Sequence, residues 1–287
     1  TEGEGQIRAL FTSAGNPVLS TPNGKALDQA LEKLDFMVSM DVYINETTRH
    51  ADLILPPASF LTQDHYDSVF NAFAVRRVTR LSQPIREREL DERADWEIIN
   101  GIGAAFAKAT GKDWQALPPP RQMIAMGLAR GNSGVNMQDL EAAEHGIDLG
   151  PLRPSLMHRL ETVSGKIETA PELFMQAFAE LTSRISFDKS ALQLIGRRDI
   201  RSNNSWMHNS PRLVKGKTRH QLLMHQDDLQ ARGISDGKSV RVRSDTGEIL
   251  VEVKASDELM PGVVCLPHGF GHQRDGVRMS QAEKVLG

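Results

Sequence analysis

The chain has 287 residues, 39% of them hydrophobic, and a formal net charge of −3. The apolar fraction is enough for the cores of two soluble globular domains, while the balanced charge excludes a general electrostatic attraction to nucleic acid. The single cysteine, Cys265, excludes an internal disulfide and any iron-sulfur or zinc site built only from cysteines of this chain.

The apolar runs and the two ends of the chain bear on its location. No apolar run is long enough to cross a membrane and no signal-like segment opens the chain, so we expect a cytoplasmic protein and leave the periplasm open. The first residue is Thr1 rather than Met, and the chain stops at Gly287 directly after a helical pattern. We therefore expect a piece of a longer protein.

The first segment, residues 1–111, alternates short apolar runs with helical patterns. Residues 7–11, 36–40 and 53–55 are predicted strands, with a helix after Asn23 and a helical turn before the third strand. Short apolar strands joined by helical crossovers form parallel sheets that are buried on both faces. The segment therefore predicts an α/β fold, with half of an open parallel βαβ sheet domain.

Polar residues follow the ends of these strands, where open parallel sheets bind their ligands. Ser13, Gly15 and Asn16 follow the first strand, and Asp41 ends the second. Gly15 allows a ligand to approach the backbone closely. Asp41 offers two acceptor oxygens, as the N1 and N2 donors of a guanine edge require, but a carboxylate at the end of a strand is also a common helix cap. Both interpretations of Asp41 stay open.

Regular elements are also expected beyond the third strand. Residues 74–81 alternate apolar and basic residues, which indicates a solvated edge strand. Asp95 is expected to cap a helix that ends at Gly111.

The middle segment, residues 112–189, is interrupted repeatedly by Pro and Gly. These interruptions predict a helical and irregular connector without a core of its own. Within it, the pattern favours a hairpin strand at residues 165–169 and a helix at residues 171–181.

The last segment, residues 190–287, is rich in strand patterns. Apolar runs at residues 192–195 and 263–266 flank a short helix that begins at Asp227 and an alternating hairpin pattern at residues 240–253. The alternation predicts an antiparallel hairpin with one buried face. Together these elements predict a small, closed β-barrel.

The run from Arg201 to Asn209 is too polar for a core. Its amide, hydroxyl, indole and imidazole groups suit an anionic ligand rich in heteroatoms, although a loop whose Asn and Ser side chains satisfy their own backbone is the alternative. His268 and His272 lie four residues apart, but the proline and glycines around them argue against the helix that would aim both at a metal. We expect no metal site there and assign the two imidazoles as donors to a ligand.

Several stretches, taken together, resemble one protein family. Residues 13–17 read Ser-Ala-Gly-Asn-Pro, residues 41–56 follow the pattern D-x-x-x-x-E-T-x-x-x-A-D-x-x-L-P, and residues 267–272 read Pro-His-Gly-Phe-Gly-His. With the polar run at residues 194–209, they resemble the dimethyl sulfoxide reductase family of molybdenum or tungsten enzymes, which carry bis(molybdopterin guanine dinucleotide). Formate dehydrogenases and nitrate reductases are members. The resemblance covers nearly the whole chain.

The resemblance implies the C-terminal part of such an oxidoreductase, inactive by itself. Residues 1–111 would be the second half of an α/β dinucleotide-binding domain, and residues 190–287 a molybdopterin dinucleotide-binding barrel of the double-psi type. The family's iron-sulfur cysteines and its metal ligand would lie in a missing N-terminal part, which would be a partner of this chain together with an electron-transfer subunit. No catalytic and no metal-ligating residue is expected here, and the substrate stays open.

The same resemblance assigns the cofactor-binding residues. Gly15 and Asn16 would meet the diphosphate of one dinucleotide and Asp41 its guanine, while the last segment would hold pterin or phosphate groups. The full set is Ser13, Gly15, Asn16, Asp41, Thr47, Arg201, Ser202, Asn203, Trp206, His208, Asn209, His268 and His272.

Two other functions are compatible with the same residues. The first is a structural homologue that keeps the fold without the cofactor, as in the large subunit of respiratory NADH dehydrogenase that resembles this family. The polar run at residues 201–209 argues against it. The second is a free-standing β-barrel binding module, which the attached βαβ half disfavours.

Overall fold

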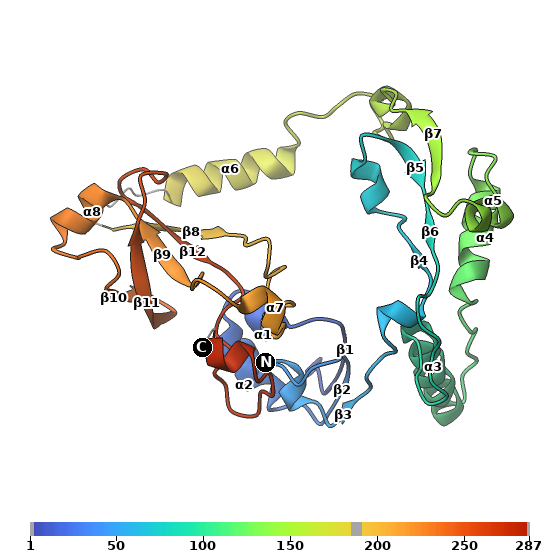
Figure 1. The fold of residues 1–287 in the computed structure, drawn as a ribbon, viewed down its shortest axis with the longest axis horizontal. Helices are drawn as coiled ribbons and strands as arrows, with labels where there is room; N and C mark the ends of the chain where they lie inside the picture. Colours follow the sequence, from blue (N-terminus) through green and yellow to red (C-terminus); the bar gives the residue numbers. More distant parts are fainter. Residues whose placement is uncertain (1–2, 185–190, 286–287) are drawn as a thin grey trace. The chain divides into compact units, whose positions relative to one another are not determined.

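The computed structural model describes residues 3–184 and 191–285, and its contacts divide the chain into two compact units (Figure 1). Unit 1 combines residues 1–55 with residues 186–287, and unit 2 is residues 56–185. Unit 1 therefore brings together the two ends of the sequence, which carry every residue predicted to bind a ligand.

A three-stranded parallel sheet opens unit 1. Strands β1 (Ala9–Ser13), β2 (Phe36–Met40) and β3 (Leu53–Ile54) pair in the order β1-β2-β3, both pairs parallel. Helices α1 (Pro17–Ser20) and α2 (Gly24–Leu31) form the first crossover, and the 3-10 turn η1 (Thr48–His50) lies in the second. Val18, Leu31 and Met37 are the buried core that joins these helices to the sheet. The predicted parallel sheet is confirmed.

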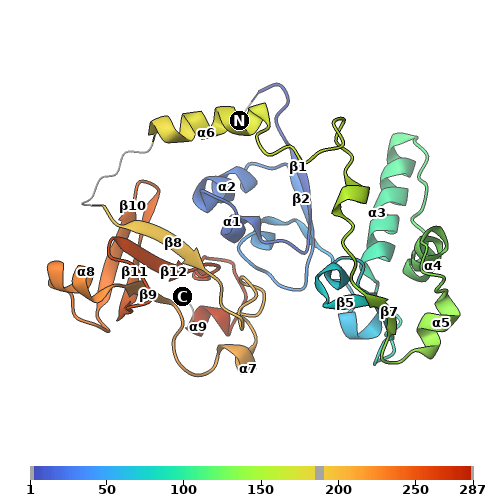
Figure 2. The ribbon, with the colours of Figure 1, turned by 90° about the horizontal axis from the view of Figure 1, so that it is seen from above.

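The remainder of unit 1 is built on a curled five-stranded sheet (Figure 2). Its strands are β8 (Gln193–Arg197), β9 (Gln221–Met224), β10 (Ser239–Ser244), β11 (Gly247–Ala255) and β12 (Val263–Pro267), in the order β10-β11-β9-β12-β8. The predicted hairpin β10-β11 is confirmed as antiparallel, whereas β11-β9 and β12-β8 are parallel.

The curled sheet has its own core and three short helices. Leu222, Val251, Val253 and Val264 are among its buried residues, and Cys265 is buried in β12. The helices are α7 (Pro211–Val214), α8 (Gln226–Ala231) and α9 (Ala282–Val285). The sheet is a half-barrel, so full closure with double-psi topology stays a prediction.

Unit 2 has two small antiparallel sheets and four helices among its described residues. The sheets pair β4 (His65–Tyr66) with β6 (Leu81–Ser82), and β5 (Arg76–Thr79) with β7 (Ile147–Pro151). The helices are α3 (Asp95–Thr110), α4 (Pro120–Arg130), α5 (Met137–Ala142) and α6 (Glu172–Arg184), with 3-10 turns η2 (Phe60–Thr62), η3 (Phe70–Phe73) and η4 (Leu156–Arg159).

Three expectations for unit 2 can be compared with these elements. The edge strand expected at residues 74–81 is divided between β5 and β6. The helix expected to end at Gly111 is α3, whose first helical residue is Asp95 and whose cap is Ala94, because the Glu97 carboxylate accepts from the Ala94 N–H. The strand expected at residues 165–169 is wrong: this stretch is irregular, and Thr162 donates to the carbonyl of Lys166 across its turn.

Candidate functional site

The loop after β1 is shaped by one residue with unusual backbone geometry. Ala14 has a φ of 48°, in the left-handed region that costs a residue with a Cβ about 1 kcal/mol or more, and its N–H donates to the carbonyl of Met40 at 2.9 Å. The predicted Gly15 is not left-handed, and a Cβ there would meet its nearest neighbour, the Ser13 carbonyl oxygen, at an ordinary 3.6 Å. The turn places Asn16 at the start of α1 with its side chain directed inward.

Asp41 is engaged by its own loop. Its Oδ1 accepts from the N–H groups of Val42 at 2.7 Å and Tyr43 at 3.2 Å, and its Oδ2 accepts from the Asn45 amide at 3.2 Å. Asp41 therefore closes a local turn after β2 and caps no helix, because residues 42–45 are not helical and the cap of η1 is Thr47. Each carboxylate oxygen can accept more than one hydrogen bond, so contact between Asp41 and a guanine stays a prediction.

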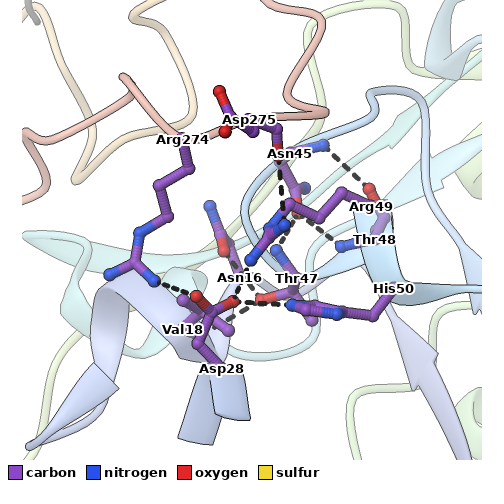
Figure 3. A network of polar contacts seen from close by, with 10 residues as sticks. All are labelled: Asn16, Val18, Asp28, Asn45, Thr47, Thr48, Arg49, His50, Arg274 and Asp275. Carbon is purple, nitrogen blue, oxygen red and sulfur yellow. Dashed lines mark hydrogen bonds and ion pairs between the residues drawn. The ribbon is translucent and has the colours of Figure 1, made fainter. Parts of the chain in front are cut away.

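The segment from Asn45 to Thr48 is polar yet buried. Figure 3 shows the side chains of Asn45, Thr47 and Thr48. The Asn45 Oδ1 accepts from the N–H groups of Thr47 and Thr48, both at 3.0 Å. Thr48 in turn donates from its hydroxyl to the Tyr43 carbonyl at 2.7 Å. Because the segment satisfies its own backbone, it can hold the side chain of Glu46 in a fully buried position.

A chain of hydrogen bonds runs from this segment to the far end of the sequence. Glu46 accepts from the Asn16 amide at 2.6 Å through Oε2, and its Oε1 lies 2.8 Å from Nδ1 of His272. Nε2 of His272 lies 2.8 Å from Nδ1 of His208. Glu46, His272 and His208 are at most 2% exposed. We refer to these three residues as the buried relay.

The electrostatics of the buried relay follow from its burial and its partners. Burial raises the pKa of Glu46, but hydrogen bonds from His272 and Asn16 and the charge of His272 outweigh it and hold that pKa below its usual value. Burial and then the charge of His272 lower the pKa of His208 to about 4, against smaller opposing effects of Gly269, Asp199 and Glu46. Glu46 is therefore ionised and His208 neutral near neutral pH.

A second polar cluster surrounds Asp28 of α2 (Figure 3). Its Oδ1 accepts from Arg49 at 2.7 Å and lies 2.6 Å from Nε2 of His50, while its Oδ2 accepts from Arg274 at 2.6 Å. Arg49 also donates to the carbonyl of Asp275 at 3.1 Å. One carboxylate thus holds the C-terminal segment against the turn that carries Glu46.

The polar run at residues 201–209 divides into two groups. Ser202, His208 and Asn209 bond within the protein: Ser202 donates to the Asp199 carbonyl at 3.0 Å, and Asn209 accepts from the Gln281 N–H at 3.0 Å. Outside the run, Nε2 of His268 lies 2.8 Å from Oδ1 of Asn204. Arg201, Asn203 and Trp206 instead lie exposed. Asn203 and Asn204 have φ angles of 42° and 63°, which turn the chain so that these groups separate.

A small pocket of about 20 Å³ lies beside the buried relay. Three predicted residues, Arg201, Ser202 and His208, line it together. Its other lining residues are Asp199, Leu213, Val214, Lys217, Thr218, Arg219 and Phe270. With three cationic side chains and one carboxylate among its walls, the pocket favours an anionic group.

The structure thus joins part of the predicted set and leaves part separate. Asn16, Thr47, His208 and His272 belong to one hydrogen-bonded chain, while Ser13, Gly15, Asp41 and His268 lie outside it. His268 and His272 have different partners, and no group of three or more His, Cys, Asp or Glu residues suited to a metal occurs among the described residues.

Sequence reasoning missed Glu46, Asp28 and the rings around His208. Phe270 packs between His208 and His220, with both ring centroid distances at 4.5 Å. Glu46 lies inside the motif at residues 41–56, which was the available signal, but a polar stretch carries no pattern that distinguishes a buried carboxylate from a solvated one.

Comparison with protein families covers both parts of unit 1. Residues 2–105 match the family model described as "Molybdopterin oxidoreductase", and residues 192–285 match the "Molydopterin dinucleotide binding domain". The chain belongs to the dimethyl sulfoxide reductase family of molybdopterin oxidoreductases. The family that the motifs resemble is therefore confirmed. No helix among the described residues has the length and apolar character needed to span a membrane.

Curated relatives align either with nearly the whole chain or with a part of it. It is 24% identical to the probable oxidoreductase YoaE of Bacillus subtilis over 92% of this chain and 39% of that protein, and 22% identical to trimethylamine-N-oxide reductase of Haemophilus influenzae over 98% and 38%. The assimilatory nitrate reductase catalytic subunit of Bacillus subtilis is 35% identical over 105 residues, 37% of this chain and 14% of that protein. The chain thus spans less than half the length of these relatives.

A solved structure confirms the fold class. Acetylene hydratase from Pelobacter acetylenicus matches with a TM-score of 0.71 at 17% identity, over 97% of this chain and 40% of that one. At this identity the likeness concerns the mixed α/β fold alone.

Proposed function

We propose that this chain holds bis(molybdopterin guanine dinucleotide), with molybdenum or tungsten, as the C-terminal part of an oxidoreductase that is inactive without its remaining part. Such a cofactor supplies oxygen-atom, hydride or electron transfer, and the protein supplies binding, orientation and electrostatics. The observation that carries the proposal is the buried relay, because it connects the loop after β1 with the polar run at residues 201–209, the two stretches expected to bind the dinucleotides.

The side chains around the relay fit such a group. Nε2 of His208 is buried and has no hydrogen-bond partner among the described residues, which is costly unless a ligand or water engages it. The pocket beside it carries Arg201, Lys217 and Arg219, which suit a diphosphate. Trp206 is 57% exposed and offers a planar face for stacking.

Within this proposal the chain's residues divide into two roles. Arg201, Asn203 and Trp206 are free to meet phosphate or pterin groups directly, together with Ser13, Gly15 and Asp41 on the sheet side. Asn16, Thr47 and His272 are already bonded within the protein, so they hold the walls of the site in place.

The finer expectations are part of the same proposal. They are the domain boundaries at residues 111 and 189, the closed double-psi barrel, an iron-sulfur cluster confined to a missing N-terminal part, an electron-transfer subunit as partner and a cytoplasmic location. A homologue that has lost the cofactor is the second candidate. In such a homologue the buried relay would contact no ligand. The Nε2 atom of His208, which has no hydrogen-bond partner among the described residues, favours a protein that binds the cofactor.

Asp41 provides the test of how the nucleotide is bound. The full-length protein is purified from a host that makes the cofactor, and released guanine nucleotide is quantified for wild type, Asp41→Asn and the control Asp35→Asn. Asp35 forms an exposed ion pair with Arg8 beside the same sheet. Asp41→Asn removes the acceptor-only fork and should lower nucleotide content, whereas Asp35→Asn should not. Unchanged content in Asp41→Asn contradicts the guanine assignment.

A further inference from the structure

Unit 2 contains a larger cavity, with a volume of about 710 Å³, which we call the unit 2 cavity. That volume lies in the range of sites that hold a small organic molecule, about 300 to 1,000 Å³. All of its lining residues lie between Asp64 and Leu149, so the cavity is formed within unit 2 alone. None of them belongs to the set expected to bind the cofactor. What this cavity holds is therefore a question beyond the proposed function.

Helix α4 supplies an apolar wall of the unit 2 cavity. The helix residues that line it share one face, and they include Met123, Ile124, Gly127 and Leu128. Met123 is 53% exposed, so this face has apolar surface left for a ligand to cover. Gly127 contributes no side chain, and a Cβ there would meet nothing within 4 Å. The wall therefore suits the apolar body of a ligand and leaves room for it.

The segment from Asp64 to Ser68 supplies a polar wall that carries negative charge. The carboxylates of Asp64 and Asp67 belong to it, and no Lys or Arg is among the described residues that line the cavity. Arg121, behind this wall, donates to both oxygens of Asp64, at 2.7 and 2.9 Å, and also pairs with Glu141. Because two carboxylates share this one guanidinium and Asp67 adds a third, the polar wall keeps an excess of negative charge.

Asp67 keeps one carboxylate oxygen available. Its Oδ1 accepts from the N–H groups of Val69 at 3.0 Å and Phe70 at 2.6 Å, which fixes the carboxylate just before η3. Its Oδ2 accepts no hydrogen bond from the described residues. Next to it in the lining, the hydroxyl of Tyr66 accepts from the buried Thr79 at 3.1 Å, which holds an aromatic ring in place. Carboxylates and aromatic rings both attract cations.

We propose that the unit 2 cavity binds an organic cation, a small molecule whose ammonium group pairs with Asp67 and whose apolar body packs on α4. An anion of the same shape would be repelled by the carboxylates of the polar wall. A neutral molecule of that shape would gain only the apolar contact. The affinity should therefore fall in the order cation, neutral molecule, anion.

Three probes of similar shape test this order on the full-length protein near neutral pH: 4-phenylbutylammonium, 4-phenylbutanol and 4-phenylbutyrate. Saturation-transfer NMR titrations measure their dissociation constants. The cation should bind with a Kd on the order of 1 mM or below and about tenfold more tightly than the alcohol, while the carboxylate should not bind. Binding of none of the three, as when other residues of the longer protein fill the cavity, overturns the proposal, and so does equal affinity for all of them.

Asp67→Asn tests the role of the charge. Asparagine keeps the Oδ1 acceptor for the N–H groups of Val69 and Phe70 and removes only the negative charge. The affinity for 4-phenylbutylammonium should fall about tenfold, and the affinity for 4-phenylbutanol should not change. An unchanged affinity for the cation contradicts the pairing with Asp67.

Gly127→Leu tests the place of binding. The added side chain enters the cavity and should prevent the binding of both probes, while the higher helix propensity of leucine preserves α4. Gly101→Leu in α3 is the matched control, because a Cβ there also meets nothing within 4 Å and Gly101 does not line the cavity. Both probes should still bind to this control. Undiminished binding in Gly127→Leu would contradict the proposal. The comparison of the three probes on the wild-type protein needs no variant and decides even if one fails to fold.

Discussion

Glu46 and His272 are joined through Oε1 and Nδ1 at 2.8 Å although 226 residues separate them in the sequence, and both side chains are fully buried. The contact fastens the turn before β3 to the loop that follows β12. Removing one member of such a buried pair leaves an uncompensated polar group, at a cost of about 3 to 5 kcal/mol. The contact therefore contributes to the stability of the folded chain.

Acid should destabilise the fold through His208 before it acts on the carboxylates. The pKa of His208 is lowered from 6.5 to about 4 by burial and the charge of His272, so between these pH values the unfolded chain binds a proton on this ring and the folded chain does not. The stabilising contribution is fully present above pH 6.5 and is lost as the pH falls toward 4, about 3 kcal/mol in all.

Melting temperatures of the full-length protein across this range check the pH prediction. The pKa of His220 is also lowered, by burial and by the charge of Arg197, so His220 also lowers the stability of the fold as the pH falls. His208→Gln should therefore reduce the change of melting temperature with pH only in part. The lowered pKa values of Glu46 and Asp28 affect stability only at lower pH. A wild-type melting temperature that does not change between about pH 6.5 and about pH 5 contradicts the burial of a neutral His208.

Asp28→Asn should loosen the C-terminal segment. Burial raises the pKa of Asp28, but hydrogen bonds from His50 and Arg49 and the charges of Arg274 and Arg49 lower it overall. The ionised carboxylate is therefore the form that holds these partners. Its replacement by Asn removes the anion that Arg49, His50 and Arg274 share and should cost about 2 to 4 kcal/mol. Hydrogen exchange should rise at residues 272–279. Asp35→Asn, at the exposed pair with Arg8, should change stability by less than about 0.5 kcal/mol; equal effects would refute the role of Asp28.

Two glycines with the same φ angle allow the cost of backbone strain to be measured apart from the cost of a steric clash. Gly269 and Gly262 both have a φ of 86°, but a Cβ on Gly269 would lie 2.8 Å from the backbone carbon and oxygen of Asn204, whereas one on Gly262 would meet nothing within 4 Å. Gly262→Ala should cost about 1 kcal/mol from its φ alone. Gly269→Ala should cost about 1 to 3 kcal/mol more and displace the Asn203-Asn204 turn. Equal melting temperatures for the two variants would contradict the close contact.

Thr47→Val tests the hydrogen bonds that fix Asn16. Valine has nearly the same shape but cannot accept from the Val18 N–H or donate to Asn16. The buried groups left without partners should cost about 1 to 3 kcal/mol. Thr21→Val removes a hydroxyl whose hydrogen bond to the Pro17 carbonyl is exposed, and it should have little effect. Similar unfolding curves for the two variants would show that Thr47 is replaceable.

The sequence predicted the elements whose signals are local. The apolar run at residues 36–40 is β2, the alternation around Asp245 is the β10-β11 hairpin, and Gly111 ends α3 with a φ of 67°. The wrong strand at residues 165–169 shows the limit of such signals, because a short alternating pattern forms a strand only where a partner strand is present.

The site depends on contacts that no local pattern contains. Glu46 reads as part of a polar loop, and its burial comes from His272 and Asn16, which reach it from distant parts of the chain. The motif at residues 41–56 predicted the family correctly without stating what Glu46 does. The polar run at residues 201–209 was expected to face a ligand as a whole, and the part-buried bonds of Ser202 and Asn209 could not be foreseen from composition.

Metal and pterin analysis of the full-length protein, purified from a host that makes the cofactor, tests the central claim most directly. The account predicts molybdenum or tungsten with two molybdopterin guanine dinucleotides for each chain, as the bis(molybdopterin guanine dinucleotide) proposal requires. A correctly folded protein that contains neither metal nor guanine nucleotide would contradict it and leave the cofactor-free homologue as the function of this fold.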